Sequence, residues 1–277
     1  MKKRIDKVYK EKNKNTLNLN LVSNFDSLKQ EDKSVYILNK PAQKITSKDL
    51  PDNSVDLVIT DPPYFDQVAY SEYLKIWEYF CGYKSILRGE LVHSNRESHQ
   101  SDKDTYLKNL HLCFSVVSKK MKDNSMAIIF FKDSKPENIY LFIEQMQNCG
   151  LQFIKTCHVQ KKKYTYKQNT TQKSTVSGEC LFFFKKVSID SKKIITYEQS
   201  SLSKDRLRIE LESIILNFIK KIRGKNPEIG LGELYDNGLI LQLYKKGLLG
   251  NIKNSNEIIK VLNTCYKKIN NRNWKIG

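Results

Sequence analysis

The run from Val55 to Tyr64, which reads VDLVITDPPY, restricts the folds open to this chain more than any other segment. Its first six residues are mostly apolar and β-branched, which predicts a short buried strand. Pro62 and Pro63 carry no backbone N–H, so they end the pairing of that strand abruptly. The residues after the strand would then lie at the carboxyl edge of a sheet, where open α/β sheets bind their ligands.

The groups that follow this strand suit a flat ligand that carries an amine. The Asp61 carboxylate and the Pro62 carbonyl are two hydrogen-bond acceptors for an exocyclic amine. The two prolines stiffen the backbone, and the ring of Tyr64 offers a face on which a planar base can stack. The same residues are also compatible with a plain strand that ends in a tight Pro-Pro turn.

These four residues resemble motif IV, Asp-Pro-Pro-Tyr, of the amino-methyltransferases that act on adenine or cytosine in nucleic acids. The resemblance implies S-adenosylmethionine as the cofactor and Asp61, Pro62, Pro63 and Tyr64 as the catalytic residues. Asp61 and Pro62 would orient the amine nitrogen toward the methyl group, and Tyr64 would stack on a base taken out of its helix. No covalent nucleophile is required, because catalysis of this transfer is mainly positioning.

The eight residues after the motif, FDQVAYSE from Phe65 to Glu72, are similar to those of large bacterial adenine-specific methylases. This resemblance covers roughly residues 35–187 and implies DNA as the substrate, with Phe65 among the nucleic-acid contacts. Aspartate at the first motif position favours adenine over cytosine within the family. In the family an acidic residue upstream contacts the adenine of the cofactor; it aligns with Thr46, and Asp49 is the nearest carboxylate, so both are expected cofactor contacts together with Asp61.

One part of the family pattern is missing. The glycine-rich turn that lets the backbone approach the cofactor closely should precede the motif, yet the first glycine of the chain is Gly82. The segment 226–233 offers a permuted alternative, but it follows a helical pattern and few residues come after it. We therefore expect the carboxyl-terminal part of a split methyltransferase, whose protein partner supplies the glycine loop.

Two other interpretations stay open at this point. The first is a non-catalytic nucleic-acid-binding subunit or degenerate methyltransferase, which the missing glycine loop favours. The second is an amino-methyltransferase that acts on RNA or on cytosine.

The pattern of apolar residues predicts an α/β fold: a partial Rossmann-like methyltransferase sheet with a small C-terminal helical domain. The helix 70–83 carries apolar residues at helical spacing, so we expect it to pack onto the sheet through Tyr73, Ile76, Trp77 and Phe80. The expected strands are 35–38, 55–60, 126–131, 151–159 and 179–184, and the other helices of this part are 105–120 and 136–149.

A formal net charge of +18 indicates a polyanionic partner, most simply nucleic acid. Residues 1–34 read as a basic, mobile N-terminal tail and 35–190 as the methyltransferase-like domain. The loop 155–173 combines lysines with aromatic rings and holds no acidic residue, a composition that suits phosphates and bases. Its expected nucleic-acid contacts are Lys161, Lys162, Lys163, Tyr164, Tyr166 and Lys167.

Residues 191–277 lose strand character and favour helices over 207–222, 233–246 and 256–268. Short helices on a basic background suit either a helix-turn-helix or winged-helix module or a docking domain. The cysteines and histidines lack metal-ligand spacing, and neither a signal peptide nor a long apolar run is present. We therefore expect no metal, no membrane segment and a cytoplasmic location.

Overall fold

The computed structural model describes residues 19–65, 70–82, 90–92, 102–133, 135–159, 179–188, 194–222, 228–230, 238–265, 267–268 and 273–275. Its centre is a four-stranded mixed sheet in the order β3-β4-β6-β5. β3 pairs with β4 in parallel, whereas β6 is antiparallel to both of its neighbours. The strands are β3 (Val55–Thr60), β4 (Met121–Phe130), β5 (Leu151–Val159) and β6 (Glu179–Lys186). The expected α/β class with a methyltransferase-like sheet is confirmed.

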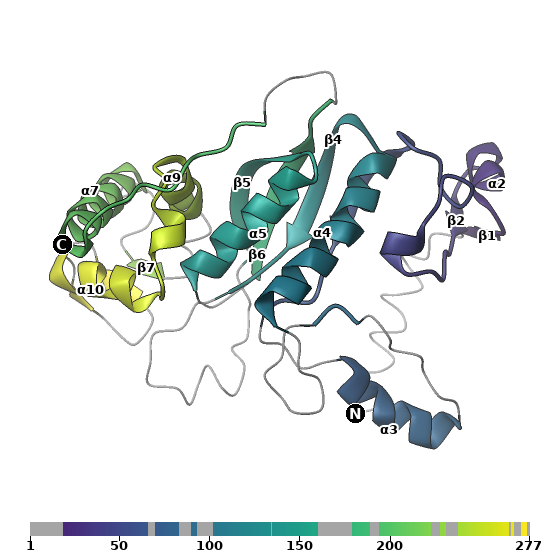
Figure 1. Ribbon diagram of the computed structural model, residues 1–277, viewed down its shortest axis with the longest axis horizontal. Helices are drawn as coiled ribbons and strands as arrows, with labels where there is room; N and C mark the ends of the chain where they lie inside the picture. The colour runs from purple at the N-terminus through teal and green to yellow at the C-terminus, as the bar shows by residue number, and fades with distance from the viewer. Residues whose placement is uncertain are drawn as a thin grey trace, which may run out of the picture.

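Two helices, α4 (Lys103–Lys120) and α5 (Pro136–Asn148), cover one face of this sheet (Figure 1). Asp102 caps α4 by accepting a hydrogen bond from the backbone N–H of Thr105 at 2.6 Å. The rings of Phe131, after β4, and Phe142, on α5, stack at 3.9 Å between centroids. Both rings are fully buried, so this contact fixes α5 over the carboxyl end of β4.

β3 is less well covered than the other strands. Among the described residues it pairs only with β4, and Leu57 and Ile59 remain 48% and 62% exposed. Period-2 alternation places these two side chains on the same face of the strand. The sheet therefore ends, in the described part of the chain, at an edge strand with an apolar face in solvent.

The first described residues form a small parallel unit of β1 (Asn20–Val22), α2 (Phe25–Gln30) and β2 (Ser34–Tyr36). Asn24 caps α2 by accepting a hydrogen bond from the Ser27 N–H at 2.9 Å. The expected tail through residue 34 is therefore wrong for residues 20–34, and residues 1–18 lie outside the described part. The polar composition concealed this unit because it is held by pairing and capping rather than by a large apolar core.

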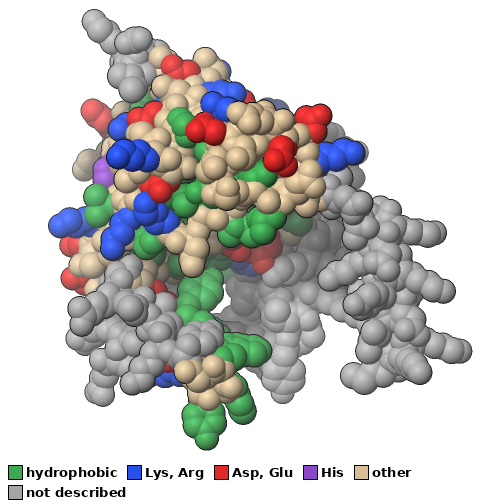
Figure 2. Space-filling view, turned by 90° about the vertical axis from the view of Figure 1, so that its right-hand side faces the viewer, with side chains coloured by type: hydrophobic (Ala, Val, Ile, Leu, Met, Phe, Trp, Pro, Cys, Tyr) green, Lys and Arg blue, Asp and Glu red, His purple; other side chains and the backbone are tan. Residues whose placement is uncertain are grey.

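α3 (Tyr70–Cys81) forms where the spacing predicts a helix, but its aromatic face is exposed. Tyr73, Ile76, Trp77 and Phe80 are between 57% and 77% exposed. Figure 2, which views the side of the molecule that carries α2, shows hydrophobic side chains gathered at its lower end, where α3 lies in Figure 1. The expectation that this face packs on the sheet is wrong for the described residues. Helical spacing reports which residues share a face, and says nothing of what covers them.

The C-terminal part contains helices and a small sheet that the sequence did not reveal. The antiparallel sheet has the order β7-β9-β8. Its strands are β7 (Glu228–Gly230), β8 (Lys267–Lys268) and β9 (Asn273–Lys275), and the helices are α7 (Lys204–Ile222), α9 (Ile240–Lys245) and α10 (Asn256–Cys265). The expected helices 233–246 and 256–268 are thus shorter in the described residues, and strands of two or three residues have too few positions to show a period.

The buried residues of the sheet, α5 and the C-terminal helices belong to one continuous core. At their junction the Tyr244 hydroxyl donates to a Glu144 carboxylate oxygen at 2.8 Å and accepts from the Gln147 amide at 2.9 Å. The Phe153 ring meets that of Tyr244 edge-on at 5.7 Å. None of the helices in the described ranges combines the length and hydropathy that a membrane-spanning segment requires.

Candidate active site

The motif residues lie where the sequence places them, directly after β3 at the carboxyl edge of the sheet. β4 runs parallel to β3 and ends at the same edge. β5 also ends there and β6 begins there, because β6 is antiparallel to β4 and to β5. Residues 160–178 connect these last two strands, so both anchors of the lysine-rich loop belong to the edge that carries the motif. The expected contacts Lys161, Lys162, Lys163, Tyr164, Tyr166 and Lys167 themselves lie outside the described residues.

Asp61 and Tyr64 are joined by a hydrogen bond. The Tyr64 hydroxyl donates to Oδ1 of Asp61 at 2.5 Å. Burial of the ring, and then the bond to Asp61, raise the pKa of the Tyr64 hydroxyl well above its ordinary value. Tyr64 therefore remains a donor at neutral pH and restricts the orientation of the carboxylate. Oδ2 of Asp61 has no hydrogen-bond partner within the described residues.

A second hydroxyl fixes the Pro-Pro turn. The Tyr106 hydroxyl, from α4, donates to the Pro63 carbonyl at 2.6 Å, and its side chain is fully buried. Burial raises the pKa of the Tyr106 hydroxyl, and the negative charge of Asp133 raises it further. This bond satisfies the carbonyl of the second proline and ties the Pro-Pro turn to α4.

The aromatic residues around the motif pack against one another. The Tyr64 ring meets that of Phe131 edge-on at 5.4 Å, and the Phe65 ring lies 4.6 Å from that of Tyr106. Phe65 is only 6% exposed. The expectation that Phe65 contacts nucleic acid is therefore wrong in this structure, because its ring belongs to the core that supports the turn.

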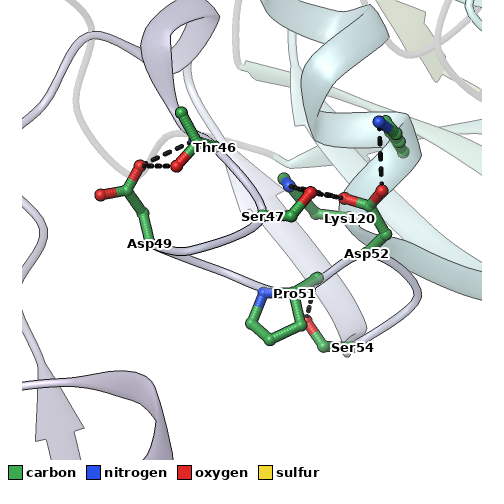
Figure 3. A network of polar contacts seen from close by, with 8 residues as sticks. Thr46, Ser47, Asp49, Pro51, Asp52, Ser54 and Lys120 are labelled. Atoms are coloured by element: carbon green, nitrogen blue, oxygen red, sulfur yellow. Dashed lines mark hydrogen bonds and ion pairs between the residues drawn. The ribbon is translucent and has the colours of Figure 1, made fainter.

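Thr46 and Asp49 lie close together in the turn before β3, where Figure 3 shows their contacts. The Asp49 carboxylate accepts from the Thr46 N–H and hydroxyl, each at 2.7 Å, and from the Lys40 ammonium at 2.7 and 2.8 Å. These donors, with Lys40 the strongest, hold the pKa of Asp49 well below its usual range. Both side chains are thus committed to holding this turn, and their role toward a cofactor stays a prediction.

A neighbouring network joins the same turn to the end of α4. The Asp52 carboxylate accepts from the Lys120 ammonium at 2.6 Å and from the Ser47 hydroxyl at 3.0 Å, and Lys119 approaches to 3.1 Å (Figure 3). These contacts, led by Lys120, lower the pKa of Asp52 to about 2. Because Lys120 is itself buried, this ion pair fixes the direction in which the chain enters β3.

A pocket of about 570 Å³ extends along β3 to the motif. Its lining includes Val55 and 57–60 of the strand, Asp61–Pro63 of the motif and the α4 face around Phe114. The volume is adequate for a small ligand. No glycine lies among the lining residues, however, so this pocket lacks the close backbone approach that the cofactor's methionine moiety requires.

Sequence reasoning missed the residues that support and surround the motif. Tyr106 and Phe131 hold the turn from neighbouring elements, and Asp133 and Glu179 supply negative charge near the two tyrosine hydroxyls. The available signal was position, because Phe131 and Asp133 directly follow β4 and Glu179 begins β6. In the described ranges no group of three His, Cys, Asp or Glu side chains is placed to hold a metal ion.

A family model described as DNA methylase matches residues 55–273 of the chain. No curated protein matches it significantly. Among solved structures, it is similar to TTHA0409 of Thermus thermophilus, described as a candidate DNA modification methylase, in its complex with S-adenosyl-L-methionine: 12% identity, a TM-score of 0.32, and coverage of 64% of this chain and 60% of that one. It is also similar to PvuII DNA methyltransferase, described as cytosine-N4-specific: 15% identity, a TM-score of 0.32, and coverage of 59% and 58%. The chain spans less than two thirds of the length of either structure.

Proposed function

Since the chain belongs to the DNA methylase family, as its resemblance to the amino-methyltransferases predicts, we propose that it holds the target base in a reaction that methylates the exocyclic amine of adenine in DNA. S-adenosylmethionine supplies the methyl group. The observation that carries this proposal is the pair formed by Asp61 and Tyr64 beside the anchored Pro-Pro turn.

Asp61 and Pro62 act together on the amine. An amino group on a base has two N–H donors, which Oδ2 of Asp61 and the Pro62 carbonyl accept. The amine nitrogen then presents its lone pair in one fixed direction. Because Tyr64 holds Asp61 and Tyr106 holds Pro63, both acceptors are positioned before the base arrives, which is the contribution that positioning makes to catalysis.

Tyr64 has a second role through its ring. A base that has left the DNA stack gains stacking energy from an aromatic face. The edge-on contact with Phe131 supports the ring from one side, and the hydroxyl bond to Asp61 sets its rotation. The lysine-rich loop, anchored at the same edge, contributes the phosphate contacts through Lys161, Lys162, Lys163 and Lys167 and base contacts through Tyr164 and Tyr166.

The cofactor half of this enzyme is contributed by a protein partner. No glycine precedes Gly82, and the pocket beside β3 has no glycine in its lining. β3 also has a strand neighbour on only one side among the described residues, which leaves an edge for further strands. Asp61 at the first motif position favours adenine over cytosine within the family.

A methylation assay with tritiated S-adenosylmethionine tests this function. DNA is incubated with the chain, alone and together with the product of the adjacent gene, and the methylated nucleosides are separated by chromatography. We expect N6-methyladenine only when both proteins are present. An Asp61→Ala variant should reduce the rate roughly a hundredfold or more, because it removes an oriented acceptor from the reacting centre, and should leave DNA affinity nearly unchanged.

The other outcomes discriminate between the parts of the proposal. Detection of N4-methylcytosine in place of N6-methyladenine would show that the target base is cytosine. Methylation by the chain alone would refute the need for a partner. If neither sample transfers methyl groups and calorimetry detects no S-adenosylmethionine binding in either, the chain is a non-catalytic DNA-binding subunit.

A further inference from the structure

The C-terminal helices and strands follow one another in the order found in a type of DNA-binding fold. They run helix α7, strand β7, helices α9 and α10, then strands β8 and β9. β9 lies between β7 and β8, and both pairs are antiparallel. This is the order and pairing of a winged helix, a helix-turn-helix fold whose second and third helices are followed by a β-hairpin. In such a fold the third helix, here α10, is the one that enters DNA.

α10 separates its residues cleanly between two faces. Ile258, Val261 and Leu262 are between 0% and 3% exposed and face the core. The exposed positions form a polar surface one helix face wide, made of Asn256, Lys260, Asn263 and Thr264. None of these four carries a negative charge. Amide, ammonium and hydroxyl groups are among those that form hydrogen bonds with base edges.

Positive charge flanks this surface. A groove of about 700 Å³ lies between α7 and α10, with Leu207, Leu211 and Val261 in its lining. Lys204 and Arg208, both exposed on α7, border it opposite Lys260. Of the other charged residues there, Glu257 accepts a bond from the Lys253 N–H, and the Lys253 ammonium pairs with Glu137 at 2.9 Å. Lys204 and Arg208 are therefore placed to contact DNA phosphates if α10 lies in the major groove.

We propose that α10 is a recognition helix that enters the major groove of duplex DNA, with Asn256, Lys260 and Asn263 facing base edges and Lys204 and Arg208 of α7 contacting flanking phosphates. An α-helix is about 10–12 Å across with its side chains, which fits a major groove about 12 Å wide. The proposal extends the proposed function, because it rests on DNA as the substrate and assigns recognition of its sequence to a site separate from the motif. Figure 1 places α7, α9 and α10 together at the end of the molecule opposite α2.

Selection from a library of randomised 20-base-pair duplexes tests this site without any methylation step. We expect the full-length chain to enrich a short sequence, and the double variant Lys260→Ala/Asn263→Ala to lose at least about tenfold of that enrichment at one or two adjacent base pairs. Lys204→Ala/Arg208→Ala should instead weaken binding to all duplexes and reduce the slope of log affinity against log salt by about two, with the enriched sequence unchanged. Lys29→Ala, an exposed lysine on α2, is the matched control and should change neither quantity.

Each other outcome overturns the proposal. No enrichment by the unaltered chain, an unchanged motif in the α10 variant, or preference for single-stranded DNA or RNA over duplex would each refute it. Circular dichroism of the variants excludes a loss of folding as the cause. The result is independent of catalysis: a chain that never methylates DNA but loses its motif in the α10 variant supports this site and refutes only the proposed activity.

Discussion

At the scale of single residues, Asp61 and Tyr64 are linked side chain to side chain. The sequence presents them as an amine acceptor and a stacking ring with separate roles. In the structure one hydrogen bond of 2.5 Å joins them, so the orientation of the carboxylate depends on the tyrosine hydroxyl. Phenylalanine at this position would keep the ring and remove that dependence.

We predict that Tyr64→Phe lowers the rate of methyl transfer about tenfold or more, since a hydrogen bond to a charged group contributes about 1.5–3 kcal/mol. Single-turnover methylation by the complete enzyme measures this rate. DNA affinity should stay within about twofold, because the ring still stacks on the extruded base. Tyr140→Phe, on α5, is the control and should leave the rate unchanged. Equal losses of rate and of DNA affinity would mean that the hydroxyl serves binding and not orientation.

The lowered pKa of Asp52 leads to a second prediction, which concerns how stability depends on pH. Its folded pKa of about 2 lies below the ordinary value of 3.8, so its ion pair with Lys120 stabilises the fold fully above that ordinary value. The contribution disappears as the pH falls from about 4 toward 2. We expect Asp52→Asn to be less stable than the unaltered chain at pH 7, and this difference to narrow on acidification.

Urea unfolding at pH 7, 4, 3 and 2 measures that difference. Asp56→Asn is the matched control, because the Asp56 carboxylate pairs with Lys122 at the surface, where ion pairs contribute little. If the difference in free energy of unfolding between Asp52→Asn and the unaltered chain stayed constant from pH 7 to pH 2, the stabilising role of the Asp52–Lys120 ion pair would be contradicted.

At the scale of helices and strands, apolar spacing predicted β3, β5, α4 and α5 to within a few residues. Each of these segments is long enough for its apolar residues to show the spacing of a helix or of a buried strand. It also placed the motif at the correct sheet edge. It could not reveal that Phe65 turns inward or that Asp49 is held by Lys40, since both depend on residues that tertiary packing brings together. The strands β7 to β9 were too short to carry a pattern.

α3 provides the sharpest test of what helical spacing can show. We predict that Trp77→Ala changes the free energy of unfolding by no more than about 0.5 kcal/mol, as for other exposed sites. Phe142→Ala, which removes a fully buried ring, should cost about 3–5 kcal/mol. Urea denaturation of both variants gives the comparison. A cost above about 2 kcal/mol for Trp77→Ala would place its ring in a packed interface, as the spacing alone suggested.

At the scale of the whole molecule, the helical C-terminal part and the sheet share one core. Tyr244 lies at the junction, where its ring meets Phe153 and its hydroxyl bonds to two side chains of α5. The expected division near residue 190 is therefore not a division of the hydrophobic core.

This continuity predicts that the two parts unfold together. Hydrogen exchange measured across a urea series should give the same midpoint for peptides from β4 and from α10. Tyr244→Ala should lower the α10 midpoint below that of β4, because it removes the ring and the hydroxyl at the junction. Tyr79→Ala, at a position 85% exposed, serves as the control. Two separate midpoints in the unaltered chain would show that the parts are independent.

The edge of β3 has a practical consequence for anyone who prepares this protein. In the described part of the chain, β3 pairs with β4 on one side only and has Leu57 and Ile59 in solvent, so its other edge is a template on which another copy can add its own strand. Purified without a companion, the chain should lose colloidal stability as its concentration rises, and a lysine in place of Ile59 would act as a gatekeeper against that loss. Production together with whatever covers this edge is then a condition for good yield.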